Sequence, residues 1–257
     1  MLYAILSDIH SNLEALTSVL DYCKKQSITK YICLGDIVGY NASPSECIEL
    51  IRNLNCSIVV RGNHDEYIGN DSTTENFNTV AKSVVIWSRE QLSKEQRKWL
   101  SELKLKSVDL RHSLTAVHST LDTPEEWNYI YDSLHANENF IHQMTQICFY
   151  GHSHVPKLFS KKNNSASENE VVKNTQWEQI SCGESSVTIS LLKTNRYLIN
   201  AGSIGQPRNG DFRASFSIYD SNEKTITRVA LHYDIENAQR RILKAGLPMS
   251  LAVRLGR

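Results

Sequence analysis

The amino-acid sequence predicts an α/β fold that starts with parallel strands and ends with antiparallel ones. From Leu2 to Val60, short apolar runs alternate with segments in which apolar residues recur at helical spacing. Strands joined through helices in this way are parallel, with right-handed crossovers. Beyond Asn200 the pattern changes to two strand-like runs, Ala214–Tyr219 and Thr225–His232, which favour antiparallel pairing.

Six short apolar runs are predicted to be buried strands, because runs rich in Val, Ile and Tyr are typical of such strands. In chain order they are Leu2–Leu6, Tyr31–Leu34, Ser57–Val60, Leu114–Val117, Ile147–Tyr150 and Tyr197–Ile199. Each run ends abruptly in a polar or glycine-containing cluster. The end of each predicted strand is therefore also a place where polar side chains gather.

Four segments carry the signals that begin or end a helix. Ser11–Glu14 and Ser43–Glu46 match the capping-box pattern, and Pro44 stands at the first helical position of the second segment. Ser93–Gln96 opens a third predicted helix. Ile235–Ala245 is predicted to be a fourth helix, since a glycine and a proline follow it.

We expect one domain over residues 1–257, since neither an internal repeat nor an interdomain linker is visible. A single α/β domain of this length is ordinary. Ser160–Gln179 is polar and has no apolar period. That composition predicts a long hairpin or a surface insertion over residues 160–179.

The charge balance argues against a partner that is held by bulk electrostatics. Lys and Arg number 28 and Asp and Glu also number 28, so the formal net charge is zero. Salt-dependent nucleic-acid binding needs a surplus of Lys and Arg, so the composition carries no strong nucleic-acid signal. A small anionic substrate held by a few local groups is compatible with this balance.

The sequence shows no sign of an export or membrane segment. Met1–Leu6 is a short apolar run that lacks a basic start and meets Ser7 at once, unlike a secretory signal. No apolar run approaches the roughly 18 residues of a membrane-spanning helix. The six cysteines include no C-x-x-C pair, which favours reduced thiols. We therefore expect a cytoplasmic protein without a membrane partner.

The polar clusters at the strand ends carry the candidate functional residues. Parallel strands place their carboxyl ends on one edge of the sheet, where ligands of open α/β sheets bind, so the clusters should converge. The converging residues are Asp8, His10, Asp36, Asn63, His64, Asp65, His118, His152 and His154. Crowded carboxylates and imidazoles need compensating cations or many hydrogen bonds. Two divalent metal ions would supply that compensation, and these donors suit Mn, Fe, Zn or Co better than Ca, with Mn favoured.

Single motifs in this set also have simpler interpretations. Gly35–Asp36 fits a turn with an aspartate helix cap, and an isolated His118 fits a surface or core histidine. Gly151–His154 is more specific, because alternating residues of one strand or turn point both imidazoles to the same side. Taken together and in this order, the motifs favour a metal site.

These motifs resemble the pattern of the calcineurin-like metallophosphoesterases, which is D-x-H, G-D-x-x, G-N-H-D/E, a lone His and G-H-x-H. The chain is similar in particular to the small prokaryotic branch of phosphoesterases and diadenosine-tetraphosphatase-like proteins. Gly35–Tyr40, Asn200–Arg208 and Ala245–Leu255 match further stretches of that branch. The resemblance implies a four-layer α/β/β/α sandwich of two mixed sheets flanked by helices.

The resemblance also implies a role for each residue of the cluster. One metal ion would be held by Asp8, His10, Asp36 and His154, and the other by Asp36, Asn63, His118 and His152, with Asp36 bridging the two. His64 would be the acid beside the leaving group, and Asp65 would hold its imidazole and favour the charged form. Departures from the family pattern affect loops rather than ligands; they are Ser11, Asn41, Ser119 and Ala201.

The implied activity is hydrolysis of a small phosphomonoester or phosphodiester, nucleotides included, by a metal-bridging hydroxide. Candidates for substrate binding are Tyr40, Arg61, Arg208 and Arg213. The planar guanidinium of Arg suits phosphate because it donates two hydrogen bonds. The alternative is that each arginine pairs with a nearby acid, such as Asp211 or Glu66.

Three other functions share the same core. A catalytically silent interaction scaffold, like the retromer subunit with this fold, would have no reason to retain a complete ligand set, whereas this chain has all seven ligands and the acid. A phosphoprotein phosphatase uses the same motifs. A nuclease is less favoured, since the net charge is zero and there is no basic run.

Overall fold

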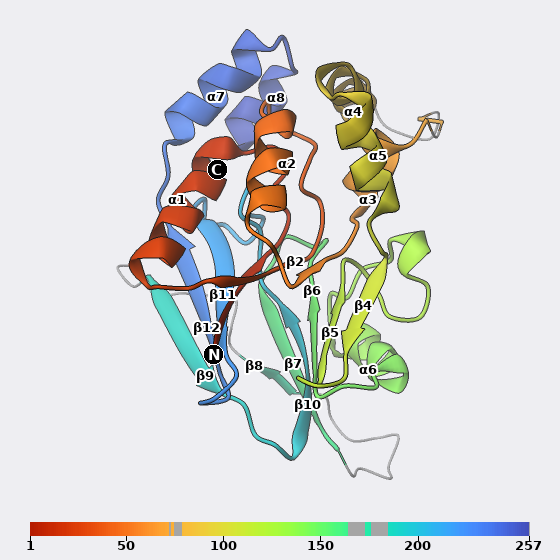
Figure 1. Cartoon of the computed structure of the whole chain (residues 1–257), viewed down its shortest axis with the longest axis vertical. Coiled ribbons are helices and arrows are strands. Elements are labelled where there is room, and N and C mark those ends of the chain that lie inside the picture. The colour runs from red at the N-terminus through yellow and green to blue at the C-terminus, as the bar shows by residue number, and fades with distance from the viewer. Residues whose placement is uncertain (72, 75–78, 164–172, 176–184, 257) are drawn as a thin grey trace.

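Two mixed six-stranded sheets form the centre of the molecule, with helices on their outer sides (Figure 1). The structure is a computed structural model, and it describes residues 1–71, 73–74, 79–163, 173–175 and 185–256. Its arrangement confirms the α/β class and the two mixed sheets flanked by helices that the motifs imply.

The first sheet joins the parallel start of the chain to its antiparallel end. Its strands, in spatial order, are β3 (Ile58–Val59), β2 (Lys30–Cys33), β1 (Leu2–Leu6), β11 (Ala214–Asp220), β12 (Thr225–Leu231) and β9 (Ser186–Ser190). β1, β2 and β3 are mutually parallel neighbours, whereas β11, β12 and β9 pair antiparallel. Both predicted pairing modes are therefore confirmed.

The second sheet has its parallel strands at the centre. Its strands, in spatial order, are β4 (Lys106–Asp109), β5 (Leu114–Val117), β6 (Ile147–Tyr150), β10 (Asn195–Asn200), β7 (Lys157–Lys162) and β8 (Lys173–Thr175). β5, β6 and β10 run parallel, so β5 and β6 end on the same edge. The loops that follow them carry the later histidine motifs.

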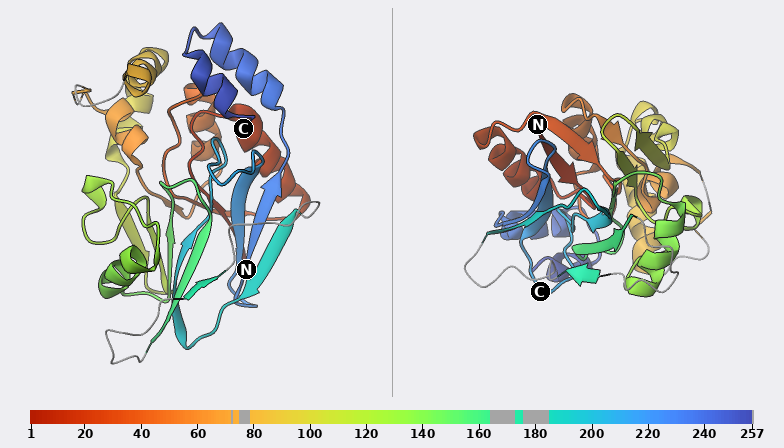
Figure 2. Two further views of the ribbon diagram at one scale, coloured as in Figure 1. Left: turned by 180° about the vertical axis from the view of Figure 1, so that it is seen from behind. Right: turned by 90° about the horizontal axis from the view of Figure 1, so that it is seen from below.

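The two sheets pack against each other, and helices pack on their outer sides (Figures 1 and 2). Successive side chains of a strand therefore point into two different cores. In β1, Tyr3 and Ile5 lie in the core between the sheets, while Ala4 and Leu6 lie in the core beneath the outer helices. β6 behaves likewise, since Phe149 joins the core between the sheets. A slip of one residue would exchange the two faces, so the register that positions the strand ends is strongly specified.

Helices form the outer layers of the sandwich. α1 (Leu13–Lys25) and α2 (Pro44–Asn53) cover the first sheet, and α6 (Ser133–His142) covers the second. The remaining helices are α3 (Asn63–Gly69), α4 (Thr79–Gln91), α5 (Lys94–Glu102), η1 (Pro124–Glu126), α7 (Ile235–Lys244) and α8 (Met249–Arg254). α4, α7 and α8 share an apolar cluster at one end of the molecule (Figure 1).

Both predicted capping boxes are wrong. The N-cap of α1 is Asn12, whose side chain accepts from the Ala15 amide at 3.1 Å, because Ser11 lies in the left-handed region and its hydroxyl accepts from Gly39 instead. Ser43 is the N-cap of α2 but makes no capping hydrogen bond through its side chain. The helix start predicted at Ser93–Gln96 is confirmed, and Ser93 and Gln96 form a capping box there.

The polar segment 160–179 lies partly in strands and partly outside the described residues. Ser160 belongs to β7, and β8 pairs antiparallel with β7. Residues 164–172 and 176–179 are outside the described part of the chain. None of the helices within the described ranges combines the length and the hydropathy that a membrane span requires.

Candidate metal centre

Strand ends from both sheets deliver the predicted residues to one buried place. They are Asp8 and His10 after β1, Asp36 after β2, His118 after β5, and His152 and His154 after β6. Two groups of side chains form there, each with ligand atoms within 4.8 Å of one another; they are Asp8, His10, Asp36 and His154, and Asp36, His118 and His152. Asp36 belongs to both groups, as a bridging residue would.

In the first group, the Nε2 atoms of His10 and His154 face each other. His10 Nδ1 lies 3.2 Å from the Val38 carbonyl and His154 Nδ1 lies 2.6 Å from the Gln206 carbonyl. A carbonyl oxygen only accepts, so each Nδ1 carries the hydrogen and each Nε2 presents a lone pair. The two Nε2 atoms are 2.9 Å apart. Burial holds the pKa of both imidazoles well below the usual range, so both are neutral and their lone pairs need a cation between them.

The imidazoles of the second group are also oriented by backbone carbonyls. His118 Nδ1 donates to the Leu34 carbonyl at 2.8 Å, which leaves Nε2 facing Asp36 Oδ2 at 3.3 Å. His152 instead donates from Nε2 to the Trp127 carbonyl at 2.7 Å, which leaves Nδ1 as the ligand atom. Imidazoles that ligate a metal almost always donate their other ring N–H in this way. Each of the four histidines therefore directs one ring nitrogen to a backbone carbonyl and the other toward the centre.

The two aspartates are oriented by hydrogen bonds. Asp8 accepts from the Ser7 hydroxyl at 2.6 Å and from the His152 amide at 3.1 Å. Asp36 Oδ1 accepts from the His64 amide at 2.9 Å, which turns Oδ2 toward the histidines of both groups, 3.5 Å from His10 Nε2. One oxygen of Asp36 is thus fixed by the backbone, and the other lies between the two groups.

Electrostatics in the centre also favours cations. Burial raises the pKa of Asp8 to about 6. Burial has the same effect on Asp36, but His118 and the neighbouring histidines outweigh it and hold the pKa of Asp36 well below its usual range. Burial lowers the pKa of His118, yet Asp36 outweighs it and raises that pKa to about 9. A proton on His118 thus balances the charge of Asp36, and a divalent cation would replace that proton.

Asn63 is the remaining predicted ligand, and it begins α3 directly before His64. Its Oδ1 atom is buried and accepts no hydrogen bond from the part of the chain that the structure describes. A buried amide oxygen without a donor is costly, and a metal ion would satisfy it.

The role predicted for Asp65 needs correction. Asp65 does not hold the His64 imidazole, because its Oδ1 accepts from the amides of Ile37 and Val38 and its Oδ2 accepts from Gly62 at 3.0 Å. Asp65 thereby ties the start of α3 to the loop after β2. The His64 Nδ1 atom is buried without a partner among the described residues, and burial lowers the pKa of this imidazole rather than raising it.

The four candidates for substrate binding divide into two pairs. Tyr40 and Arg208 lie beside the centre: the Tyr40 ring is 4.6 Å from the His10 ring and 4.5 Å from the His64 ring, and Arg208 Nη2 donates to the Tyr40 hydroxyl at 3.4 Å. Arg61 and Arg213 follow the alternative of pairing with acids. The ion pairs are Arg61 with Glu66 at 2.8 Å and Arg213 with Asp211 at 2.7 Å.

Backbone strain marks the centre, and the sequence patterns did not indicate it. Seven of the twelve non-glycine residues with positive φ in the described ranges belong to the site or its loops; they are Asp8, His10, Ser11, Asp36, Tyr40, His152 and His154. Left-handed backbone is unfavourable for such residues and clusters at functional sites. Ser7 and the Trp127 carbonyl were also missed, since neither belongs to a recognisable motif.

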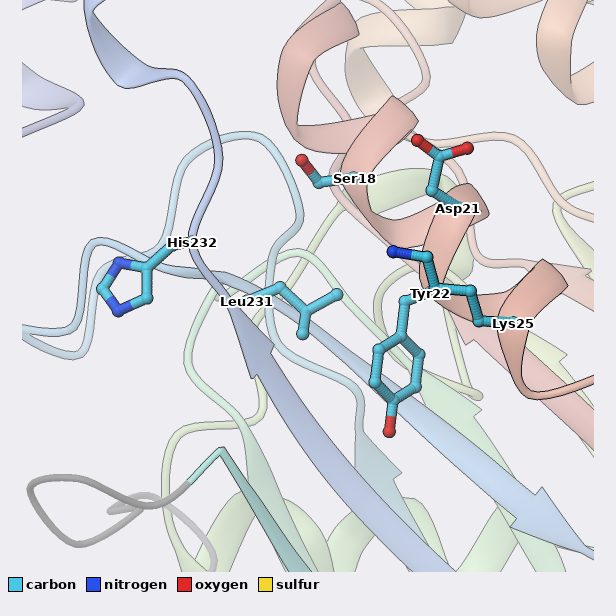
Figure 3. A pocket seen from close by; sticks show the side chains of 6 residues that line it. All are labelled: Ser18, Asp21, Tyr22, Lys25, Leu231 and His232. Carbon is cyan, nitrogen blue, oxygen red and sulfur yellow. The ribbon is translucent and has the colours of Figure 1, made fainter.

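One hollow on the surface lies away from this centre. It has a volume of about 290 Å³ and is formed by side chains from α1 and from the end of β12 (Figure 3). Its lining residues are Ser18, Asp21, Tyr22, Lys25, Leu231 and His232. None of the clustered carboxylates and imidazoles takes part in it, so it is separate from the candidate metal centre.

Comparison with known proteins gives consistent matches over most of the chain. A sequence model described as the calcineurin-like phosphoesterase superfamily domain matches residues 1–224. An uncharacterized protein of Methanocaldococcus jannaschii is 37% identical over 254 residues, which cover 98% of this chain and 96% of that protein. The crystal structure of a metallophosphoesterase from Sphaerobacter thermophilus is 35% identical, covers 100% of this chain and 98% of its own, and superposes with a TM-score of 0.83. A hypothetical protein from Pyrococcus horikoshii shares the fold, with 20% identity, coverage of 99% and 97%, and a TM-score of 0.78.

Proposed function

This chain belongs to the calcineurin-like phosphoesterase superfamily, and from that membership we propose that it hydrolyses a small phosphoester with two divalent metal ions. Asp8, His10, Asp36 and His154 would hold one ion, and Asp36, Asn63, His118 and His152 would hold the other. The observation that carries the proposal is the 2.9 Å approach of two neutral imidazole nitrogens, on His10 and His154, beside a buried carboxylate.

The donor set suits ions of the Mn, Fe, Zn and Co type, and we favour Mn. Divalent ions in such a centre lower the pKa of bound water and neutralise charge on the phosphoryl oxygens. The chain itself fixes the donors, because every ligating imidazole is oriented by a backbone carbonyl and Asp36 by the His64 amide. Little reorganisation would then be needed when substrate binds.

His64 is the group best placed to give a proton to the leaving oxygen. Its ring lies 4.8 Å from the His10 ring and its Nδ1 atom has no partner among the described residues. A negatively charged phosphoryl group nearby would raise the pKa of the imidazole and so load it with the proton. Asp65 supports this role indirectly, because it anchors the loop and the helix start that carry His64.

We propose a small phosphomonoester or phosphodiester as substrate, nucleotides included. Arg208 supports this choice, because its guanidinium faces the neutral side chains of Tyr40 and Gln206 and keeps its charge for an anion. The zero net charge favours such a substrate over a nucleic-acid polymer.

Removal and return of metal tests the proposal directly. Protein treated with chelator should lose its phosphoesterase activity, and single additions of Mn, Mg, Zn or Fe should restore it, with two ions per chain by elemental analysis. The measurement uses a panel of phosphomonoesters, phosphodiesters and dinucleoside polyphosphates. Protein carried through the same steps without chelator is the control. Full activity in excess chelator contradicts the proposal, and absence of both metal and activity would favour an interaction scaffold.

The position of the His64 ring can be tested through Gly39. This residue has φ +104°, and a Cβ atom at this position would lie 2.5 Å from His64 Nδ1. Gly39→Ala should therefore displace the ring and lower kcat about 10²-fold while both metals stay bound. Gly246→Ala is the matched control, since Gly246 also has positive φ but meets nothing within 4 Å. Equal effects of the two substitutions on kcat would show that backbone strain, and not contact with His64, is responsible.

A further inference from the structure

A cleft of about 550 Å³ adjoins the candidate metal centre. It is lined on one side by Tyr40, Gln206 and Arg208, and on the other by residues of α4 and α8 that include Thr79, Ser250 and Arg254. A neighbouring hollow of about 420 Å³ shares Arg208, Ser250 and Arg254 with it. The two arginines therefore lie where the two hollows meet.

The cleft adjoins the metal centre through Tyr40 and Gln206. The Tyr40 ring, which lines the cleft, lies 4.6 Å from the His10 ring and 4.5 Å from the His64 ring. The carbonyl of Gln206, two residues before Arg208, accepts from His154 Nδ1. A substrate with one end on the centre would extend its other end into this cleft.

Two arginines give the cleft its positive charge. Arg208 donates only to Tyr40 and Gln206 through its side chain, and its Nε atom is buried without a partner in the described residues. Arg254 is exposed and makes no hydrogen bond or ion pair with the described part of the chain, in contrast to Arg61 and Arg213. No Asp or Glu lies among the described residues that line the two hollows.

Arg254 projects from a fixed support. α8 is anchored by Leu251, Ala252 and Leu255, which are buried against Ile242 of α7 and Val84 of α4. A guanidinium on a packed helix loses less conformational freedom on binding than one on a free loop, and its planar fork matches two phosphate oxygens.

We propose that this cleft binds a second phosphate group of the substrate, so that the natural substrate is a small phosphoester with two phosphate groups. One phosphate would lie at the metal centre and the other between Arg208 and Arg254. The Thr79 and Ser250 hydroxyls would complete the second site as neutral hydrogen-bond donors. The inference rests on the proposed function, since it assigns the first phosphate to the metal centre.

Non-hydrolysable probes test the second phosphate site. Alkane bisphosphonates with spacers of increasing length are compared with the matching alkyl monophosphonates by calorimetry on the Mn-loaded protein. At the best spacer length, the bisphosphonate should bind about 10-fold more tightly, as expected for charge-assisted hydrogen bonds. Arg254→Gln should remove that preference, and Arg254→Lys should keep part of it. Arg240→Gln, which removes an exposed arginine of α7 paired with Glu236, is the matched control and should keep the preference.

A kinetic comparison separates this inference from the proposed function. The ratio of kcat/KM for a nucleoside 3′,5′-bisphosphate to that for the 5′-monophosphate should fall about 10-fold in Arg254→Gln, mainly through KM. If the protein hydrolyses both esters and Arg254→Gln leaves the ratio of their kcat/KM values unchanged, the second phosphate site is refuted and the phosphoesterase activity stands. If it hydrolyses neither, yet an Arg254-dependent preference for bisphosphonates persists, the cleft stands and the activity is refuted. Equal binding of mono- and bisphosphonates at every spacer length overturns the inference.

Discussion

Asp36→Asn is expected to lower phosphoesterase activity by at least about 10³-fold and to reduce the bound metal below two ions per chain. Asp36 is the only side chain common to both groups of ligand atoms in the described residues, and its Oδ2 atom lies between them. Removing its negative charge leaves two ions facing each other with one carboxylate, Asp8, in the set. A 10³-fold loss of activity corresponds to about 4 kcal/mol less stabilisation of the transition state, which is the order expected when a charge that offsets both ions is removed.

The same substitution should leave the fold intact. An asparagine has the shape of aspartate, and its amide oxygen can still accept from the His64 N–H. Its amide nitrogen would then face the lone pairs of His10 and His118, to which it can donate. In chelator, the melting temperature of Asp36→Asn should therefore be no lower than that of the unsubstituted chain. Asp21→Asn, on the exposed side of α1, is the control. Full activity with two bound ions in Asp36→Asn would refute the bridging role.

The strands were predictable because both of their faces are buried. Tyr3 and Ile5 face one core and Ala4 and Leu6 the other, so every residue of β1 after Leu2 is buried and the strand appears as a continuous apolar run. The cap of α1 was not predictable from the capping pattern. Ser11 has the residue type of a cap, but the loop that carries His10 forces it to φ 56° and the next residue caps the helix.

The ligand groups were predictable for a different reason. Residues that follow neighbouring parallel strands lie at one sheet edge, so the order of motifs brings Asp8 and Asp36 together. His118 follows β5 of the other sheet, so its place beside Asp36 depends on how the two sheets pack. The direction of individual side chains was harder to infer. Asp65 stands three residues after Gly62, which is the spacing at which an acid returns to the amide at a helix start. That spacing was present in the sequence, and it predicts that Asp65 accepts from the Gly62 amide and not from the His64 imidazole.

Local sequence patterns predict the partners of some arginines but not of others. Arg61 and Arg213 have acids five and two residues away in the chain, and these local acids pair with them. Arg208 has no acid close in sequence except Asp211, which Arg213 already binds. Arg254 comes to the same cleft only because α8 packs on α4 and α7, a tertiary contact that no local pattern encodes.

His64→Ala should retain both metals and show a loss of activity that depends on the leaving group. No metal-ligand group of the centre includes His64, so removal of the imidazole leaves the donors in place. A p-nitrophenolate departs readily without a proton, whereas a sugar or serine alkoxide does not. We expect a substantial share of activity on p-nitrophenyl esters and a loss of about 10²-fold or more on alkyl phosphoesters and nucleotide diesters.

Single-turnover kinetics with both kinds of ester is the measurement that decides the role of His64, because it isolates the chemical step from product release. His142→Ala, an exposed histidine at the end of α6, is the control and should not change either rate. An equal loss on both leaving groups, with metals retained, would assign His64 to positioning the phosphoryl oxygens instead of donating a proton. Loss of metal in His64→Ala would instead make it part of the metal centre. Only a loss that grows with the basicity of the leaving oxygen fits a proton donor, since the benefit of protonation is greatest where the departing oxygen is least able to carry charge.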